Sequence, residues 1–344
     1  MLLQFARRMA TSSKPYVEMC KVGIIGSNGG IGRHLALMLK LNNYVTDLGL
    51  YSASDSRGVA VDLSHIDTQA RVTAYSGEQK NLIEAMKCCD LVVVTAGLAH
   101  SEKVKTRSEL FKANGELMLK FTKAIACACH EKMPLIHIVT NPVNSLVPIC
   151  AEYLKYISCY DPRKVSGSCS IDTTRARTFL SQLKNVDPKK YNVPVIGGHS
   201  SKTITPLVSQ IKPAIDMSPQ EQEKLSYRII HGVDEVLNAK KGAGTAQLAL
   251  GYCVERFCNS YLSTIYGAKD VMEVGFVPAD INECEFFGCN FTLDKNGVKE
   301  CQRLPKMTEM EIHRYYEAVE NVKKNIYRAR EFVQNYLRQQ KEKA

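Results

Sequence analysis

Closely spaced glycines interrupt an apolar run near the start of the chain, and this pattern could bind a phosphate. Residues 21–33 read as a short buried strand that breaks at Gly26 into a turn and continues as a helix near Gly30. Gly26 and Gly29 carry no side chain, so the backbone can turn tightly and approach a pyrophosphate, whose charge then faces the first N–H groups of the helix. Gly32 lets the helix pack closely on the strand. A glycine turn that binds nothing is the alternative interpretation of these residues alone.

Apolar runs separated by helical stretches indicate the elements that hold this turn. A second strand at residues 48–51 follows at the distance that a strand–helix–strand unit requires. Residues 90–97 and 135–141 each read as a strand in which apolar residues mostly follow one another rather than alternate with polar ones, as in parallel sheets covered by helices on both faces. The sequence therefore predicts an α/β fold with a Rossmann-type, doubly wound parallel sheet. Ligands of such sheets bind beyond the carboxyl ends of the strands, where the glycine turn falls.

The pattern changes after about residue 163. Residues 274–277 and 283–298 read as antiparallel strands, with Asn296-Gly297 as a tight turn. This half lacks the strand–helix–strand rhythm. We therefore predict a dinucleotide-binding domain at residues 20–163 and an α+β domain for substrate binding and catalysis at residues 164–344.

The composition argues against several classes of binding partner. The chain has 344 residues and a net charge of +10, but the basic residues are spread among acidic ones, so we expect no nucleic-acid binding. Its 13 cysteines form no paired CxxC motifs, which indicates a reducing compartment and no metal site. Because no stretch of about 20 apolar residues occurs, we expect no membrane span.

The first 19 residues fall outside the predicted fold. Arg7 and Arg8 lie among Ser, Thr, Leu and Phe, and no acidic residue precedes Glu18. This composition is typical of an amphipathic transit peptide and predicts a mitochondrial matrix protein. A frayed N-terminus on a cytoplasmic protein is the alternative.

Six ordered motifs between residues 20 and 338 give the chain a resemblance to a known family. It resembles the malate dehydrogenase branch of the lactate/malate dehydrogenase family, and its Gly-Gly-His-x-x-Lys-Thr form is most similar to the mitochondrial-type members. The resemblance implies NAD as the cofactor, a small 2-hydroxy or 2-oxo acid as the substrate, and a homodimer. The motifs are residues 26–32, 61–65, 141–144, 171–175, 196–203 and 242–246.

The resemblance implies a catalytic role for His199 and Asp172. Oxidising a 2-hydroxy acid requires a base for the hydroxyl proton while a hydride leaves the same carbon, and histidine titrates near neutrality. Asp172 would hydrogen-bond the far ring nitrogen of His199, fix its tautomer and favour the imidazolium. Arg175, three residues after Asp172 and so on nearly the same helical face, would bind the C1 carboxylate of the substrate with two donors. A satisfied turn histidine and a surface arginine are the structural alternatives.

Further site residues follow from the same resemblance. Arg107 would polarise the reacting carbonyl when its loop closes and excludes water. Asn141 would orient cofactor and substrate, although an Asn before Pro is also ordinary turn chemistry. The residues expected to contact the cofactor are Gly26, Gly29, Gly30, Ile31, Gly32, Ser52, Ala96, Gly97, Asn114 and Asn141.

The loop at residues 96–107 departs from the family pattern. Malate dehydrogenases have two arginines there, and the earlier one binds the distal carboxylate of the substrate. This chain lacks that arginine, its loop is one residue longer, and it offers His100 and Lys103 near the position. Lys103 could supply the charge but not the two-pronged geometry. A buried carboxylate without a charged partner would cost roughly 2 to 5 kcal/mol, so we expect weakened malate activity or a shift toward monocarboxylic or aromatic 2-oxo acids.

Ser52 is the second departure. At the end of the second strand the family usually has an acidic residue that binds the adenine ribose diol and repels a 2′-phosphate. Ser52 accepts one hydrogen bond but carries no charge, and Arg57 is near. We expect NAD to bind with reduced discrimination against NADP, although Asp55 in the same turn counts against NADP.

Three functions are consistent with the sequence. The first is an NAD-dependent malate dehydrogenase, because His199, Asp172, Arg175 and Arg107 are all present. The second is a related 2-hydroxy acid dehydrogenase with a shifted substrate. The third is a non-catalytic paralogue that acts as a binding subunit, since both departures concern ligand recognition.

Overall fold

A parallel half-sheet forms the first part of the structure. The computed structural model describes residues 20–98, 106–129, 131–281 and 284–342. Neighbouring strands of the first half run parallel in the order β3-β2-β1-β4-β5-β6, which confirms the predicted doubly wound fold. The sixth strand begins after residue 163, so the parallel half extends past the expected boundary to Gly167. The strands are β1 Lys21–Ile25, β2 Asp47–Ser52, β3 Arg71–Ser76, β4 Leu91–Val94, β5 Leu135–Ile138 and β6 Val165–Gly167.

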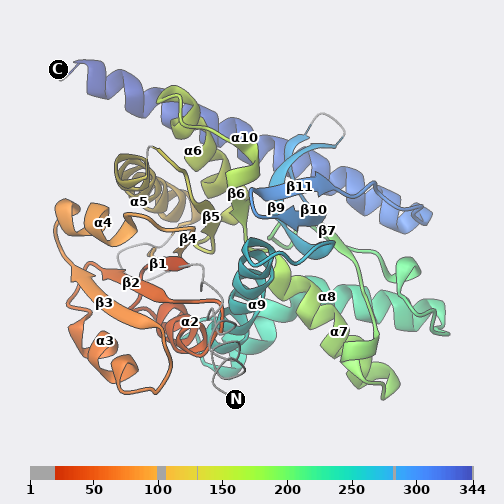
Figure 1. Ribbon diagram of the computed structural model, residues 1–344. Coiled ribbons are helices and arrows are strands. Elements are labelled where there is room, and N and C mark those ends of the chain that lie inside the picture. Colours follow the sequence, from red (N-terminus) through yellow and green to blue (C-terminus); the bar gives the residue numbers. More distant parts are fainter. Residues whose placement is uncertain (1–19, 99–105, 130, 282–283, 343–344) are drawn as a thin grey trace, which may run out of the picture.

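Helices cover both faces of these strands (Figure 1). Strands β4 and β5 are buried along their whole length, which explains why their sequences are apolar without alternation. One face carries α4, α5 and α6, and the other carries α2, α3 and, from the second half, α9. The helices of the first half are α2 Gly30–Lys40, α3 Arg57–Ser64, α4 Gln79–Met86, α5 Arg107–Ala128 and α6 Val143–Tyr156.

An antiparallel group of strands continues the same sheet. Strand β9 pairs with β6, β10 pairs with β9, β7 and β11, and β8 pairs with β7. The predicted tight turn joins β10 to β11, and Gly297 in it has a φ of +112°, a conformation that favours glycine. The strands are β7 Val195–Gly197, β8 Ile204–Pro206, β9 Val271–Ile281, β10 Cys284–Asp294 and β11 Gly297–Cys301.

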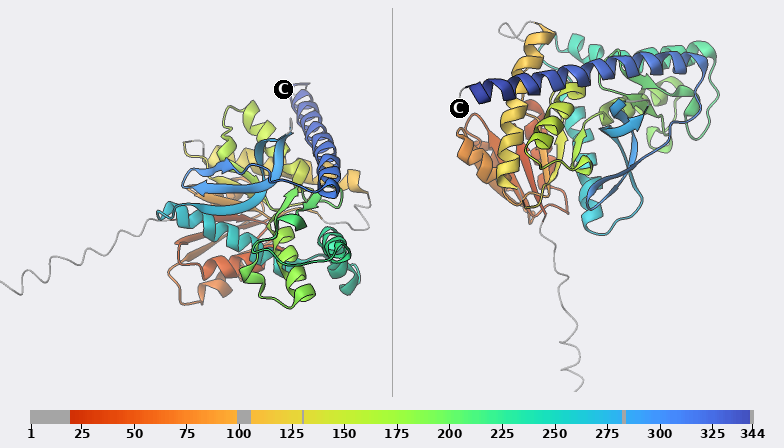
Figure 2. Two further views of the ribbon diagram at one scale, coloured as in Figure 1. Left: turned by 90° about the vertical axis from the view of Figure 1, so that its right-hand side faces the viewer. Right: turned by 90° about the horizontal axis from the view of Figure 1, so that it is seen from above.

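The helices of the second half include one that crosses the whole molecule. Helix α10 packs on α6, β7, β8 and β10, and the view from above shows it spanning both halves (Figure 2). A separate apolar cluster lies between α7 and α8 and includes Phe179, Leu225 and Ile229. The helices are α7 Ser170–Lys184, α8 Pro219–Ala239, α9 Gln247–Ile265 and α10 Glu309–Glu342, with single 3-10 turns at Pro162–Lys164, Pro188–Lys190 and Val208–Gln210.

Within the described ranges, none of the helices combines the length and the apolar character that crossing a bilayer demands.

Candidate active site

The glycine turn follows β1 and is closely packed. Gly26 has a φ of +102°, and its N–H donates to the Tyr51 carbonyl oxygen at 2.8 Å. A Cβ atom added to Gly26 would lie 2.5 Å from the Ala96 nitrogen, and one added to Gly32 would lie 2.1 Å from the Gly26 oxygen. Both positions therefore require glycine, because any side chain would displace backbone atoms.

Polar groups at this turn are left for a ligand. Helix α2 has Gly29 as its N-cap, and no side chain caps its first N–H groups. In the described part of the chain, the Ser27 hydroxyl and the Asn28 Oδ1 are buried without a hydrogen-bond partner. Uncapped amides, a positive helix terminus and unpaired polar groups fit the pyrophosphate of a dinucleotide.

Ser52, the residue predicted to contact the adenine ribose, lies at the end of β2. Ser52 is largely buried, and its hydroxyl lies 3.4 Å from the Ser54 hydroxyl. The guanidinium of Arg57 donates to Asp55, with the Nη2 and Oδ2 atoms 2.6 Å apart. This hydrogen bond lowers the pKa of Asp55, so the carboxylate stays charged and holds Arg57.

His199 and Asp172 are brought together from two elements. His199 follows β7, and Asp172 lies in the first turn of α7; His199 Nδ1 is 2.6 Å from Asp172 Oδ2. The Asp172 side chain is 1% exposed and that of His199 is 15% exposed. Because the carboxylate accepts the proton on Nδ1, the Nε2 atom of neutral His199 is free of a proton and can accept one. Arg175 lies beside the pair, with its Nη1 3.8 Å from Asp172 Oδ1.

Two opposing effects set the pKa of His199. Burial lowers the pKa, as for any cationic acid removed from water. The charge of Asp172 and its hydrogen bond raise it by more, while the charge of Arg175 lowers it, and the net shift of the pKa is upward. The site therefore favours the imidazolium.

The backbone around His199 is held by a buried asparagine, for which the sequence predicted no role. Asn144, at the start of α6, accepts from the His199 N–H at 2.8 Å and donates to Thr203 Oγ1 at 3.1 Å. Gly197 has a φ of +106°, and a Cβ added there would lie 1.9 Å from the Thr203 oxygen. The only signal for Asn144 in the sequence is its place just after an apolar strand.

A cavity of about 160 Å³ adjoins these side chains. Asn141, Asp172, Arg175 and His199 line it, so the structure brings these predicted site residues together. Thr245 and Ala246 line it as well, just before α9. The next residue, Gln247, occupies the space that a Cβ on Gly30 would need, 2.3 Å from the glutamine Cδ, so the segment before α9 links the cavity to the glycine turn. Sequence reasoning missed Gln247.

Asn114 joins two loops at the carboxyl ends of the parallel strands. It is 1% exposed, its Oδ1 accepts from the Leu98 N–H at 2.7 Å, and its Nδ2 donates to the Asn141 oxygen at 2.8 Å. Gly97 lies against it, since an added Cβ would lie 2.3 Å from Thr140 Cγ2 and 3.1 Å from Asn114 Oδ1. Asn114 therefore holds the two loops together, and its contact with the cofactor stays a prediction.

The structure describes only part of the substrate loop at residues 96–107. Lys103 and His100 lie outside the described residues. Arg107 begins α5, and its side chain also lies outside the described part. The first turn of α5 is capped by Thr106 and Glu109, whose side chains each accept from the other residue's backbone N–H.

Over the described ranges, His, Cys, Asp and Glu side chains form no group of three or more that could hold a metal ion.

Comparison with known proteins places the whole chain. The family model of the lactate/malate dehydrogenase NAD-binding domain matches residues 20–167, and that of the α/β C-terminal domain matches residues 169–333. The mitochondrial malate dehydrogenase of Felis catus is 40% identical over 329 residues, which cover 96% of this chain and 95% of that protein. The Homo sapiens mitochondrial enzyme is 39% identical over 327 residues, 95% of each.

Solved structures agree with these matches. The apo malate dehydrogenase of Picrophilus torridus superposes with a TM-score of 0.80 at 26% identity, covering 93% of this chain and 100% of the other. A lactate dehydrogenase of Cryptosporidium parvum, solved with lactic acid and nicotinamide adenine dinucleotide, shares the fold with a TM-score of 0.78 at 20% identity, covering 91% and 98%. From its sequence matches over nearly its full length, this chain belongs to the lactate/malate dehydrogenase family.

Proposed function

We propose that this protein is an NAD-dependent malate dehydrogenase, which interconverts malate and oxaloacetate. The observation that carries the proposal is the 2.6 Å contact between His199 and Asp172 beside Arg175, in a cavity that adjoins the glycine turn. A base, its orienting carboxylate and a cation for the substrate carboxylate are the groups that oxidation of a 2-hydroxy acid requires.

Each site residue has a distinct proposed role in the reaction. In malate oxidation, His199 Nε2 takes the hydroxyl proton, and Asp172 stabilises the imidazolium through Nδ1. A bound nicotinamide would supply the acceptor for the hydride that leaves the same carbon. Arg175 binds the C1 carboxylate, Asn141 orients the reacting groups at the end of β5, and Arg107 polarises the carbonyl oxygen of the oxo acid. In the reverse direction, the protonated His199 returns its proton to that oxygen.

The glycine turn is the proposed site of the cofactor pyrophosphate, with Gly26, Gly29, Gly30, Ile31 and Gly32 around it. Ser52 takes the adenine ribose without a charge that repels a 2′-phosphate, which supports partial tolerance of NADP. The pairing of Arg57 with Asp55 works against it, because the guanidinium already has an anionic partner. We therefore propose NAD as the preferred cofactor with reduced discrimination.

A shifted substrate is the second candidate function, and the loop sequence is what favours it. Residues 96–107 lack the earlier arginine of malate dehydrogenases, and Lys103 is the proposed replacement for the distal carboxylate. A lysine binds a carboxylate as a point charge, whereas an arginine forms two hydrogen bonds with it. With a lysine, the second carboxylate of oxaloacetate therefore adds less binding free energy, and the preference for oxaloacetate over a monocarboxylic acid is smaller.

One panel of assays tests these proposals. Oxaloacetate, pyruvate and phenylpyruvate are each supplied with NADH and with NADPH, and kcat/KM is measured for the wild type, His199→Asn and His100→Arg. We expect oxidation of the reduced cofactor in the wild type, a loss of about 100-fold or more in His199→Asn, and a gain for oxaloacetate in His100→Arg.

The possible outcomes separate the candidates. Activity with pyruvate or phenylpyruvate but not with oxaloacetate would establish the shifted substrate. A strong preference of the wild type for oxaloacetate with no gain in His100→Arg would refute the shift. Tight NADH binding without turnover of any acid would refute both dehydrogenase functions and support the third candidate, a non-catalytic binding subunit.

Assembly and location complete the proposal. We propose a homodimer that uses α2 and α9, because each presents an exposed apolar pair one helical turn apart, Leu37 with Leu41 and Leu248 with Tyr252. We also propose the mitochondrion as its location. The basic composition of residues 1–19, which lie outside the described part, and the mitochondrial names of its relatives support this location.

A further inference from the structure

Two cysteines on neighbouring strands bring their thiols together, away from the candidate active site. The thiols of Cys289 in β10 and Cys301, the last residue of β11, lie within hydrogen-bonding distance of each other. The Cys301 sulfur is in turn 3.7 Å from the Pro278 carbonyl oxygen. Cys301 lies opposite Phe291 in the ladder, so Cys289 is its diagonal neighbour on the same face of the sheet. Both thiols are free in this structure.

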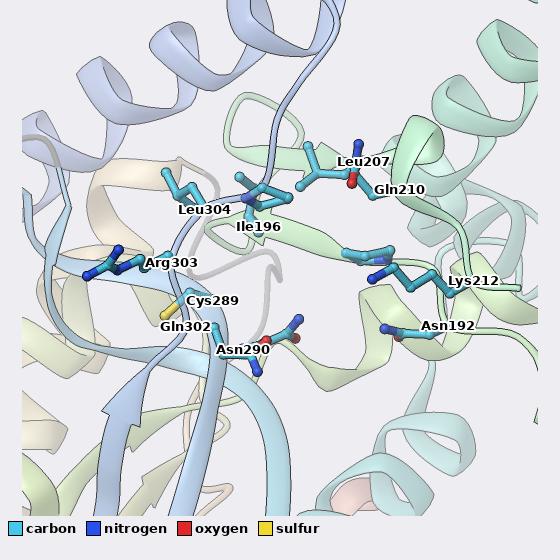
Figure 3. Close-up of a pocket in the computed structure, with 12 residues that line it drawn as sticks. Asn192, Ile196, Leu207, Gln210, Lys212, Cys289, Asn290, Gln302, Arg303 and Leu304 are labelled. Carbon is cyan, nitrogen blue, oxygen red and sulfur yellow. The ribbon is translucent and has the colours of Figure 1, made fainter. Parts of the chain in front are cut away.

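Each thiol can be reached by a small molecule. Cys301 is half-buried at the surface. Cys289 is 1% exposed, but it lines a cavity of about 140 Å³ on the side opposite Lys212 (Figure 3). Acidic residues are missing from the described lining of this cavity, which carries the carboxamides of Asn290 and Gln302 beside that ammonium group. Such a lining suits a small, hydrogen-bonding or anionic molecule.

We propose that Cys289 and Cys301 form a redox site, at which a hydroperoxide converts the two thiols into a disulfide between β10 and β11. The thiolate of Cys301 attacks the peroxide, so an S–O bond forms, the O–O bond breaks, and the leaving oxygen departs as water or an alcohol after taking a proton. The Cys289 thiol then attacks the sulfenic sulfur of Cys301. An S–S bond forms, the S–O bond breaks, and the hydroxide leaves as water with the Cys289 proton. Two electrons pass from the thiols to the peroxide.

The order of attack follows from exposure, because Cys301 is half-buried at the surface whereas Cys289 is 1% exposed. The contact with Cys289 also lowers the pKa of Cys301, and the same contact together with burial raises the pKa of Cys289. Cys301 is therefore the nucleophile, and Cys289 reacts in the second step.

The site is connected to the catalytic histidine through the backbone. Gly288, which precedes Cys289, pairs with Gly197 of β7, two residues before His199. The strands approach so closely there that a Cβ on Gly288 would lie 3.0 Å from the Gly197 oxygen. Diagonal neighbours are about 7 to 8 Å apart at Cα, and a disulfide requires less than about 7 Å. Bond formation therefore draws β10 toward β11 and displaces the strand that supports β7.

Peptide mapping tests the disulfide without reference to activity. The full-length protein is treated with hydrogen peroxide, the remaining thiols are alkylated, and tryptic peptides are identified by mass spectrometry before and after reduction with dithiothreitol. We expect one cross-linked species that joins the peptide of Cys289 to the peptide of Cys301 and disappears on reduction. Cys301→Ser should abolish it. Cys284→Ser is the matched control, because Cys284 is a buried thiol in the same strand and the same tryptic peptide, and this variant should form the cross-link normally.

The effect on turnover rests on the proposed function and is measured separately. We expect peroxide to lower kcat for oxaloacetate reduction by about 3-fold or more in the wild type and in Cys284→Ser, with recovery on reduction, and to have no such effect in Cys301→Ser. If peroxide consumes the exposed thiols of Cys88 and Cys127 but no Cys289–Cys301 cross-link forms, the redox site is refuted. A cross-link without a change in kcat would refute its connection to His199. An unmodified wild type without dehydrogenase activity would refute the proposed function and leave the disulfide to be judged by its peptides.

Discussion

At the scale of single residues, one carboxylate distinguishes two buried histidines. His137 in β5 stacks on Phe257 with ring centroids 3.8 Å apart, and its Nδ1 contacts the Ser166 hydroxyl at 2.9 Å. Burial lowers the pKa of His137 to about 3, so it is neutral at physiological pH. Burial also lowers the pKa of His199, but Asp172 raises it by more, so the net shift of this pKa is upward. The proton affinity of the proposed catalytic base therefore depends on Asp172.

The first prediction at this scale concerns pH. Oxaloacetate reduction requires protonated His199, so kcat/KM should be high below the raised pKa and fall as the pH rises through it. Malate oxidation requires neutral His199 and should rise over the same range. In Asp172→Asn burial and the charge of Arg175 remain, and both lower the pKa of His199, so this pKa should drop below its ordinary value. The alkaline limb of reduction should then move to lower pH, with a loss of about 100-fold or more at neutral pH.

The control for this experiment is another histidine–aspartate pair. His231 Nδ1 lies 3.3 Å from Asp234 Oδ2 on the exposed face of α8. Asp234→Asn should leave the pH profile unchanged. An unshifted profile in Asp172→Asn would mean that another group supplies the proton.

Some of the site could be predicted from residue types, and some could not. The glycine turn follows from physical reasoning, because the absence of side chains at Gly26 and Gly32 is itself the signal. The pairing of His199 with Asp172 depends on a long-range approach that only the order of motifs in the family suggested. Asn144 and Gln247 were missed, because an asparagine inside an apolar segment and a glutamine at a helix start carry no local sign of their distant contacts.

At the scale of elements, α10 anchors the start of α5. The Arg328 guanidinium lies 4.1 Å from the centre of the Phe111 ring, and its Nη2 donates to the Ser108 hydroxyl at 2.8 Å. The same ring packs edge-on against Phe332, with centroids 5.3 Å apart. The first turn of α5, which begins at Arg107, is therefore held from outside by the last helix of the chain.

The prediction at this scale is a loss of substrate affinity in Arg328→Met. Because Arg328 is exposed, the hydrogen bond and the cation–π contact together should change the KM for oxaloacetate by about 3- to 10-fold. The KM for NADH should stay the same, since the glycine turn is not involved. Steady-state kinetics would measure both constants. Arg338→Met, an exposed arginine on the same helix, is the matched control, and equal KM values in the two variants would show that α10 does not position the substrate loop.

Strands β1, β2, β4 and β5 were predictable because continuous apolar runs require burial on both faces, whereas β3 and β6 were not predicted. The extent of β9 and β10 was not predictable either, since both strands run for 11 residues across positions of mixed character. Their length follows from pairing with each other, which no local pattern specifies.

At the scale of the whole molecule, two domains were predicted where one sheet extends through both. Strand β9 pairs with β6 at Phe276 and Gly167, so the antiparallel strands extend the parallel half. The sequence does change after residue 163 from alternating strands and helices to another pattern. The sheet nevertheless continues past this point, because the edge strand β6 pairs with the antiparallel strand β9. The two walls of the proposed site are consequently parts of one hydrogen-bonded framework.

The exposed apolar pairs on α2 and α9 lead to a prediction about assembly. A charge placed at the centre of a buried interface is costly, so Tyr252→Glu should convert the proposed homodimer to monomers. Sedimentation velocity would measure the change. Tyr327→Glu is the control, because Tyr327 is an equally bulky side chain, 64% exposed on α10, and this variant should remain dimeric. Persistence of the dimer in Tyr252→Glu would place the interface elsewhere.

Helix α2 starts on glycines, and no side chain accepts hydrogen bonds from its first backbone N–H groups. A bound nucleotide would accept these hydrogen bonds. A ligand that binds only the native form adds about 2.7 kcal/mol to the unfolding free energy at 100 times its dissociation constant. Proteases that attack opened chains would then degrade this protein more slowly where nicotinamide nucleotides are abundant. Its turnover in the cell would thus follow the supply of the coenzyme.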